Sequence, residues 1–262
     1  MEIRFVKLRK DNKEFNFTIK NNEINGIYCL EPEILKKIMH FNKPIEGKII
    51  VNKKEISNDS LKEIKKKISI VENDFRKYYQ TRVYELMYYT IIEKNLTLKN
   101  PKKKILDSLK IVGLNSNYLD RQLSTLSSSE KRQIQFALAL LSNPELIIMD
   151  EPFVNYDLKT SKKMWMLIQK MKDQYNKTFI WISHDIDNLY KYCTNLIIMK
   201  NNKILIEGKT YDIIKKVEYL KKNKIPIPPI IDFIYQVKKN KDINLEYHND
   251  VRDILKDIYK HV

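Results

Sequence analysis

A chain of 262 residues with 43% hydrophobic residues is long enough to bury a large core, either as one domain or as one domain with a small appendage. It contains no run of 18 apolar residues and no apolar segment near its start, so we expect neither a membrane-spanning helix nor export. The two cysteines and four histidines are scattered, which argues against a zinc site and favours buried thiols in a reducing compartment.

The formal net charge of +16 at pH 7 has two interpretations. It could serve contact with nucleic acid or with an anionic membrane surface. It could also be the lysine-rich solvated surface of a compositionally biased chain. The lysines lie in many small clusters rather than one block, and no RNA-binding or helix-turn-helix pattern occurs, so we favour the second interpretation and expect no specific nucleic-acid partner.

The first 71 residues are expected to be rich in strands. Residues 15–30 alternate apolar and polar side chains around a polar turn, which predicts two joined strands. Residues 32–41 begin with Pro32 and carry apolar residues at helical spacing. Residues 43–56 form a hairpin-like pattern around a glycine turn, and residues 66–71 are another short apolar strand.

The middle of the chain changes to helices and then alternates. Apolar residues recur at spacings of three and four from about residue 74 to residue 140, which indicates a helical subdomain. Apolar runs at 145–150 and 177–185 predict two buried parallel strands, separated by an amphipathic helix at 158–175, and 194–209 predicts a hairpin. Strands and helices that alternate on both sides of a helical insert favour an α/β core with a mostly parallel sheet.

The C-terminal part, behind a proline-rich joint after residue 221, predicts two short helices. Each has an apolar face, and the residues are Ile230, Ile231, Ile234 and Tyr235 for the first and Val251, Ile254, Leu255 and Ile258 for the second. These faces either pack on the rest of the chain or form a dimer contact. We favour the dimer contact as a hypothesis.

Reactive side chains follow the two predicted parallel strands. Asp150 and Glu151 come at the end of one strand, and His184 follows the other. Ligands of a doubly wound sheet bind at the carboxyl ends of its strands, where a carboxylate can hold a metal ion and a second one can orient an attacking water. The alternative, which spacing alone leaves open, is that the acidic pair starts a turn and His184 caps a helix.

Several motifs together resemble the nucleotide-binding subunits of ATP-binding cassette transporters. Residues 146–152, LIIMDEP, resemble the Walker B strand with its catalytic glutamate, and residues 182–185, ISHD, resemble the switch histidine. Residues 155–157, NYD, are similar to the D-loop, and residues 126–130, LSSSE, are similar to the signature that usually reads LSGGQ. Residues 196–214 resemble the closing hairpin of the cassette.

The resemblance implies a fold and a set of roles. The fold is a P-loop-NTPase-like, mostly parallel sheet with an N-terminal antiparallel β part, a helical subdomain and a small C-terminal helical appendage. The cofactors are ATP and Mg²⁺, with Asp150 on the metal and Glu151 and His184 in catalysis. The implied nucleotide-binding residues are Ser127, Ser128, Ser129, Glu130, Glu72 and Asp157.

The C-terminal part narrows the resemblance to the A-component ATPases of energy-coupling factor transporters, prokaryotic importers of vitamins and metals. It implies a cassette over residues 1–220, with its helical subdomain at about 75–140, and a helical dimerisation appendage over residues 221–262. It also implies a peripheral position on the cytoplasmic face of the membrane. The implied partners are a second cassette subunit, as a heterodimer, and an integral-membrane transport subunit.

The sequence departs from the family where phosphate should be held. Its four glycines include no two that are five apart, as a G-x-x-x-x-G-K-[ST] loop requires. Glu31 and Glu33 place negative charge at a helix start that would otherwise attract phosphate. Glu72 replaces the glutamine of the Q-loop, and serines at 128 and 129 replace the signature glycines.

These departures predict a divergent subunit that is catalytically impaired at its own site and pairs with an active ATPase. Its Ser127 could still contact ATP held by that partner, because in this family ATP lies between two subunits. One alternative is an active ATPase with an atypical phosphate loop. Another is a soluble cassette protein that acts on the ribosome or on nucleic acid.

Overall fold

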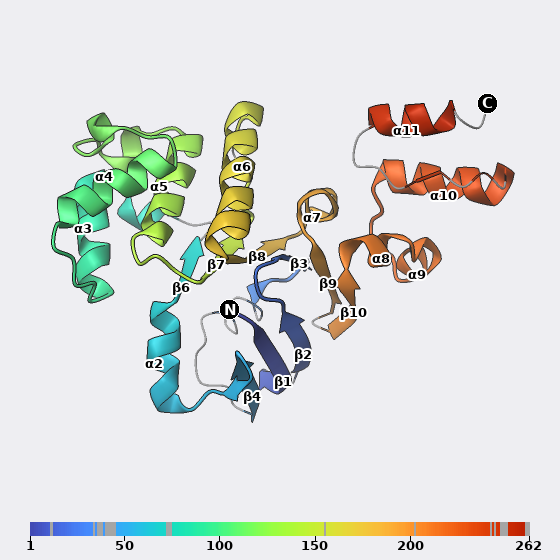
Figure 1. Cartoon of the computed structure of the whole chain (residues 1–262), viewed down its shortest axis with the longest axis horizontal. Helices are drawn as coiled ribbons and strands as arrows, with labels where there is room; N and C mark the ends of the chain where they lie inside the picture. Colours follow the sequence, from blue (N-terminus) through green and yellow to red (C-terminus); the bar gives the residue numbers. More distant parts are fainter. Residues whose placement is uncertain are drawn as a thin grey trace.

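The structure is a computed structural model of the whole chain (Figure 1). It describes residues 1–10, 13–33, 35, 39, 46–71, 75–154, 156–201, 203–241, 243, 245–246 and 251–259. Within these ranges two sheets and the helices around them form an α/β architecture, as the sequence predicted.

The N-terminal sheet is antiparallel and has the strand order β2-β1-β4-β5. Its strands are β1 (Ile3–Lys10), β2 (Lys13–Ile19), β4 (Glu46–Val51) and β5 (Lys54–Glu55). Alternation places the apolar side chains of β1 and β2 on one face, where Phe5 and Phe17 stack with ring centroids 4.4 Å apart.

The second sheet has six strands in the order β10-β9-β3-β8-β7-β6. The strands are β3 (Ile24–Tyr28), β6 (Ile68–Val71), β7 (Leu146–Asp150), β8 (Thr178–Ser183), β9 (Asn195–Lys200) and β10 (Lys203–Lys209). All neighbours are parallel except β9 and β10, which form the predicted hairpin. Residues 15–30 do contain two strands, but β2 and β3 belong to different sheets, so the turn between them joins two layers.

The helices surround the sheets, with α2 beside the antiparallel sheet and α7 near the middle of the molecule (Figure 1). The group α3, α4 and α5 lies on one side of α6, and α8 to α11 lie at the opposite end of the molecule. The bounds are α2 Asn58–Lys66, α3 Val83–Glu93, α4 Pro101–Ile111, α5 Ser128–Leu140, α6 Leu158–Tyr175, α7 Ile186–Tyr192, α8 Thr210–Ile214, α9 Val217–Lys222, α10 Pro229–Lys241 and α11 Val251–Ile258. Short 3₁₀ turns span Arg76–Tyr78, Ser116–Tyr118 and Leu123–Thr125.

The core lies on both faces of the six-stranded sheet. All residues of β3, β7 and β8 are buried, and successive side chains point to opposite faces. On one face Met149 and Trp181 pack with the helices. On the other face Ile148 and Ile182 pack with the antiparallel sheet. This double burial explains why these strands are continuous apolar runs in the sequence.

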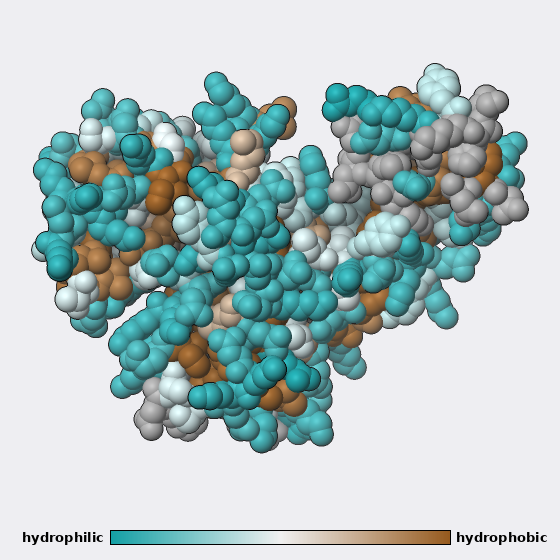
Figure 2. Space-filling model, in the orientation of Figure 1, coloured by the Kyte–Doolittle hydropathy of each residue, from teal (hydrophilic) through white to brown (hydrophobic). Residues whose placement is uncertain are grey.

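The surface is mostly polar, in keeping with the net charge (Figure 2). Hydrophobic residues gather over the α3–α5 group and beside the C-terminal helices in this view. No helix in the described ranges is both long and apolar enough to cross a membrane.

Candidate active site

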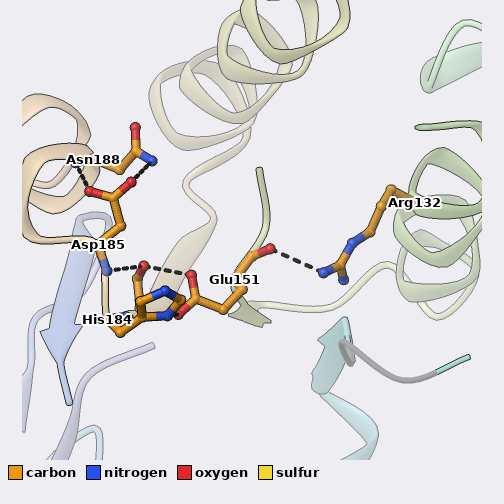
Figure 3. Close-up of polar contacts among 6 residues, drawn as sticks. Arg132, Glu151, His184, Asp185 and Asn188 are labelled. Atoms are coloured by element: carbon orange, nitrogen blue, oxygen red, sulfur yellow. Dashed lines mark hydrogen bonds and ion pairs between the residues drawn. The ribbon is translucent and has the colours of Figure 1, made fainter. Parts of the chain in front are cut away.

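The candidate catalytic residues meet at the carboxyl ends of two neighbouring strands. Asp150 is the last residue of β7 and pairs with Ile182 of β8. Glu151 follows Asp150, and His184 follows the last residue of β8. The parallel pairing of β7 and β8 therefore brings the acidic pair and the histidine to one edge of the sheet (Figure 3).

Glu151 holds the end of β8 with both carboxylate oxygens. Its Oε1 accepts a hydrogen bond from the His184 backbone N–H at 2.7 Å and lies 2.5 Å from His184 Nδ1 (Figure 3). Its Oε2 accepts a hydrogen bond from the Ser183 hydroxyl at 2.6 Å. The side chain of Glu151 is 14% exposed and that of His184 is 65% exposed. A largely buried carboxylate thus orients an imidazole whose far side faces solvent.

The backbone around Glu151 is strained and tied down. Its φ of 46° is in the left-handed region, which non-glycine residues rarely adopt and which recurs at functional sites. Its N–H donates to Ile182 O at 3.0 Å, and its carbonyl accepts from Arg132 Nη2 at 3.1 Å (Figure 3). These contacts fix the turn that places the carboxylate over β8.

Arg132 is a site residue that the sequence analysis did not single out. It comes from α5, is almost fully buried, and its contact with the Glu151 carbonyl joins the helical group to the end of β7. Burial lowers the pKa of Arg132, while Tyr156, Asp150 and Glu151 act in the opposite direction. No local pattern in the sequence indicates this contact, because it depends on how α5 packs against the end of β7.

The end of β8 is closed by a helix cap. Ser183 Oγ accepts a hydrogen bond from the Asp185 N–H at 2.9 Å. Asp185 in turn caps α7, because its Oδ1 accepts from Asn188 N at 3.1 Å and its Oδ2 from the Asn188 side chain at 2.6 Å (Figure 3). Ser183 therefore joins Glu151 to the start of α7.

The end of β3, where a phosphate loop would begin, has a different construction. Cys29 N–H donates to Ser183 O at 3.2 Å. After Leu30, Glu31 and Pro32, the described residues Glu33, Leu35 and Met39 are helical. No glycine follows until Gly47. Gly26 within β3 serves packing, because a Cβ there would lie 2.8 Å from Cys193 Sγ.

The signature segment, residues 126–130, forms the N-terminus of α5. Ser127 is the N-cap, and its Oγ accepts from the Glu130 N–H at 3.2 Å while Glu130 Oε2 accepts from the Ser127 N–H at 2.8 Å. The Tyr118 hydroxyl donates to Glu130 Oε1 at 2.6 Å, and Arg121 lies 3.7 Å from the same oxygen. Burial raises the pKa of Glu130, but these donors outweigh it and hold the pKa below its ordinary value. A carboxylate thus occupies the positive end of α5.

The remaining nucleotide-site predictions lie at the starts of helices α5 and α6. Ser128 and Ser129 are in the first turn of α5, and the Ser129 hydroxyl is buried without a hydrogen-bond partner among the described residues. Asp157 caps α6 by accepting from Thr160 N at 2.8 Å. Glu72 lies outside the described residues. Within the described part of the chain, the side-chain hydrogen bonds of Ser127 and Glu130 go to each other and to Tyr118, and those of Glu151 go to the end of β8, while its carbonyl accepts from Arg132.

The carboxylates at the end of β7 suit a magnesium ion better than they suit the phosphates of a nucleotide. Mg²⁺ is held by one or two carboxylates, with water and phosphate oxygens supplying the rest, and Asp150 at a strand end matches that need. The described residues contain no group of three metal-ligating side chains, so most ligands would have to come from water and phosphate. A glycine-rich loop commonly cradles phosphates, and the sequence has no glycine between Gly26 and Gly47.

Comparison with known proteins gives a consistent result. The sequence model of the ABC transporter family matches residues 33–154. The energy-coupling factor transporter ATP-binding protein EcfA2 of Mycoplasma mobile is 27% identical over 83% of this chain and 70% of its own length, and EcfA2 of Clostridium perfringens is 29% identical over 79% and 75%. The structure of cbiO1 from Clostridium perfringens, part of the ABC transporter complex cbiONQ, superposes with a TM-score of 0.70 at 22% identity, over 89% of this chain and 98% of that one.

Proposed function

Because the chain belongs to the ATP-binding cassette family, we propose that it is an ATP-binding subunit of an energy-coupling-factor-type importer for a vitamin or another micronutrient. Its own nucleotide site is catalytically impaired. It pairs with a second, active cassette subunit, which holds most of the ATP and Mg²⁺. Together they drive an integral-membrane transport subunit from the cytoplasmic face of the membrane.

The proposal of an impaired site is supported by the contrast between the ends of β7 and β8 and the end of β3. At β7 and β8, Glu151 and His184 are 2.5 Å apart, which suits a general base held by a histidine. At β3, the chain enters the helix through Glu31 and Glu33 without a glycine. A general base needs a positioned phosphate, and carboxylates at a helix start repel one.

Pairing is supported by the state of Ser127. Its hydroxyl oxygen accepts from the Glu130 N–H at 3.2 Å, and its side chain also hydrogen-bonds the Glu130 carboxylate, which helps to lower the pKa of Glu130. Residue 127 is exposed, so in the proposal its hydroxyl turns from Glu130 to a phosphate oxygen presented by another subunit. In the proposal Ser127 acts on the partner's ATP, while the carboxylate of Glu130 weakens that contact.

In the proposal the C-terminal helices contact the partner through a face that includes Leu255 of the expected set and adds Phe233. Ile231 and Ile234 of α10 are buried within this chain. Phe233 and Leu255, by contrast, are about half-exposed and line an apolar cavity of about 540 Å³ beside α7. The side chains of Val251 and Ile254 lie outside the described residues. We assign the partner contact to the Phe233 and Leu255 face.

A second candidate function, an active ATPase with an atypical phosphate grip, is favoured by one observation. The Glu151–His184 pair is complete and its backbone is anchored at 3.0 Å to Ile182. A site without catalytic use would not need the strained left-handed backbone of Glu151.

One experiment separates the two candidates. The chain is purified with its partner and transport subunit, and ATP turnover is measured for Glu151→Gln in this chain and for the matching change in the partner. We expect the first variant to stay within about twofold of the unmodified complex and the second to lose turnover by a hundredfold or more. Glu145→Gln, at the residue just before β7, controls for the same substitution away from the site. A comparable loss from Glu151→Gln alone would support the active ATPase.

A further inference from the structure

A second cavity of about 550 Å³ lies at the open edge of the six-stranded sheet. It is bounded by β6, the end of α3 and the middle of α5, with Met39 on one side. Its polar centre contains Lys94, which follows α3, and Ser69, the second residue of β6. Neither residue belongs to the candidate active site at the far ends of β7 and β8.

Lys94 reaches into this cavity without an acidic partner. Its Nζ donates to Ser69 Oγ at 3.0 Å and lies 3.5 Å from Ser142 Oγ. No described carboxylate lies within ion-pair distance of Nζ, and the end of α3 supplies only a partial negative charge. Burial lowers the pKa of Lys94, and Glu93 offsets this only in part. The ammonium has lost water without gaining a counter-ion.

The side chains of Lys94, Ser69 and Ser142 carry more hydrogen-bond donors than their contacts with one another use. The ammonium carries three hydrogens and each serine hydroxyl carries one. The two Lys94 contacts and the 3.0 Å contact between Ser69 Oγ and Ser142 Oγ use three of these five hydrogens. One N–H and one O–H therefore have no acceptor among the described residues. Ser69 is only 2% exposed, whereas Lys94 and Ser142 are partly buried, so access of bulk water to the cluster is restricted on the Ser69 side.

The charged side chains around the cavity are mainly positive, like Lys94 itself. Lys65 and Lys77 also line it, and Glu93 is the acidic residue among the lining residues. Two basic side chains at the rim and one inside attract an anion, and the unused donors supply hydrogen bonds to it.

We propose that this cavity binds a compact oxyanion, such as inorganic phosphate, on Lys94 with Ser69 and Ser142. The anion would accept the unused N–H and O–H and would neutralise the ammonium. The proposal does not depend on the proposed function, because the cavity is separate from Glu151 and from the signature segment.

The test uses the full chain and inorganic phosphate as the probe, with chloride at matched ionic strength as the reference. Binding is followed by titration calorimetry for the unmodified chain, for Lys94→Met and for Ser142→Ala. Lys110→Met, on the exposed last turn of α4, is the matched control. We expect saturable binding that Lys110→Met retains and that Lys94→Met weakens by about tenfold or more.

Two further readouts decide the outcome. In the unmodified chain, phosphate should raise the pKa of Lys94, measured by NMR of methylated lysines, toward its ordinary value. If Lys94→Met fails to fold by circular dichroism, Ser142→Ala decides, and it should weaken binding severalfold. The proposal is overturned if phosphate does not saturate the chain, which would leave only water in the cavity. It is also overturned if the affinity of the folded variants equals that of Lys110→Met.

Discussion

The substitution Ser127→Ala separates a role on the partner's nucleotide from a role in capping α5. In this chain the Ser127 hydroxyl accepts from Glu130 N at 3.2 Å and also hydrogen-bonds the Glu130 carboxylate, and residue 127 is exposed. Loss of the cap should cost about 0.5–1 kcal/mol of stability, toward the low end of the usual range, because Glu130 Oε2 still accepts from the residue 127 N–H at 2.8 Å. That cost alone should leave turnover at moderate temperature unchanged.

The effect on turnover should be larger if the hydroxyl contacts phosphate. A hydrogen bond to a charged oxygen contributes about 1.5–3 kcal/mol, so its loss should slow ATP turnover by the reconstituted pair about tenfold to a hundredfold. The matched control is Ser57→Ala, which removes an equivalent capping serine from α2. The reasoning is refuted if both variants keep the turnover of the unmodified pair, because Ser127 would then be a cap and nothing more.

The remaining predictions concern Glu130, the C-terminal helices and Gly26. Glu130→Gln should raise ATP turnover by the pair, and it should make the loss of folding stability in acid less steep. The folded-state pKa of Glu130 is lowered, so the carboxylate contributes its full stabilisation above the ordinary pKa of 4.5 and loses it as the pH falls below that value. Acid denaturation curves that coincide for the two proteins would contradict this. Truncation after Lys224 would remove Ile225 and Ile231 from the main core, so Phe233→Ser, at a half-exposed position, should weaken pairing on a sizing column while the cassette stays folded, and unchanged pairing would remove this face from the interface. Gly26→Ala should cost about 1–3 kcal/mol in thermal unfolding, because its Cβ would lie 2.8 Å from Cys193 Sγ; a smaller loss would mean that β3 and α7 shift apart easily.

The sequence predicted the parts of the fold that are buried on two faces. β7 and β8 are apolar along their whole length, so their runs were visible and their reactive ends followed directly. α2 was missed, because it is short and polar and begins with a serine cap rather than an apolar stripe. Periodicity could not assign β2 and β3 to different sheets, because alternation fixes the face of a strand but not its neighbour.

The candidate site was predictable in its strand ends and not in its cross-chain contacts. Asp150, Glu151 and His184 follow from strand polarity alone. The contact of Arg132 with the Glu151 carbonyl depends on how α5 packs against the sheet, and no local pattern encodes that packing. The same holds for Lys94, whose two serine contacts come from segments 25 and 48 residues away. A capping box, in contrast, is local, and the Ser127–Glu130 spacing already contained it.

The central claim is that this chain does not itself hold ATP in a productive site. Its most direct test is titration calorimetry of the isolated full-length chain with magnesium-ATP. The account predicts no binding, or binding weaker than about 1 mM, because the loop after β3 is missing and Glu31 and Glu33 stand in its place. A dissociation constant in the low micromolar range, about 8 kcal/mol of binding free energy, would contradict it and establish a nucleotide site of a different construction.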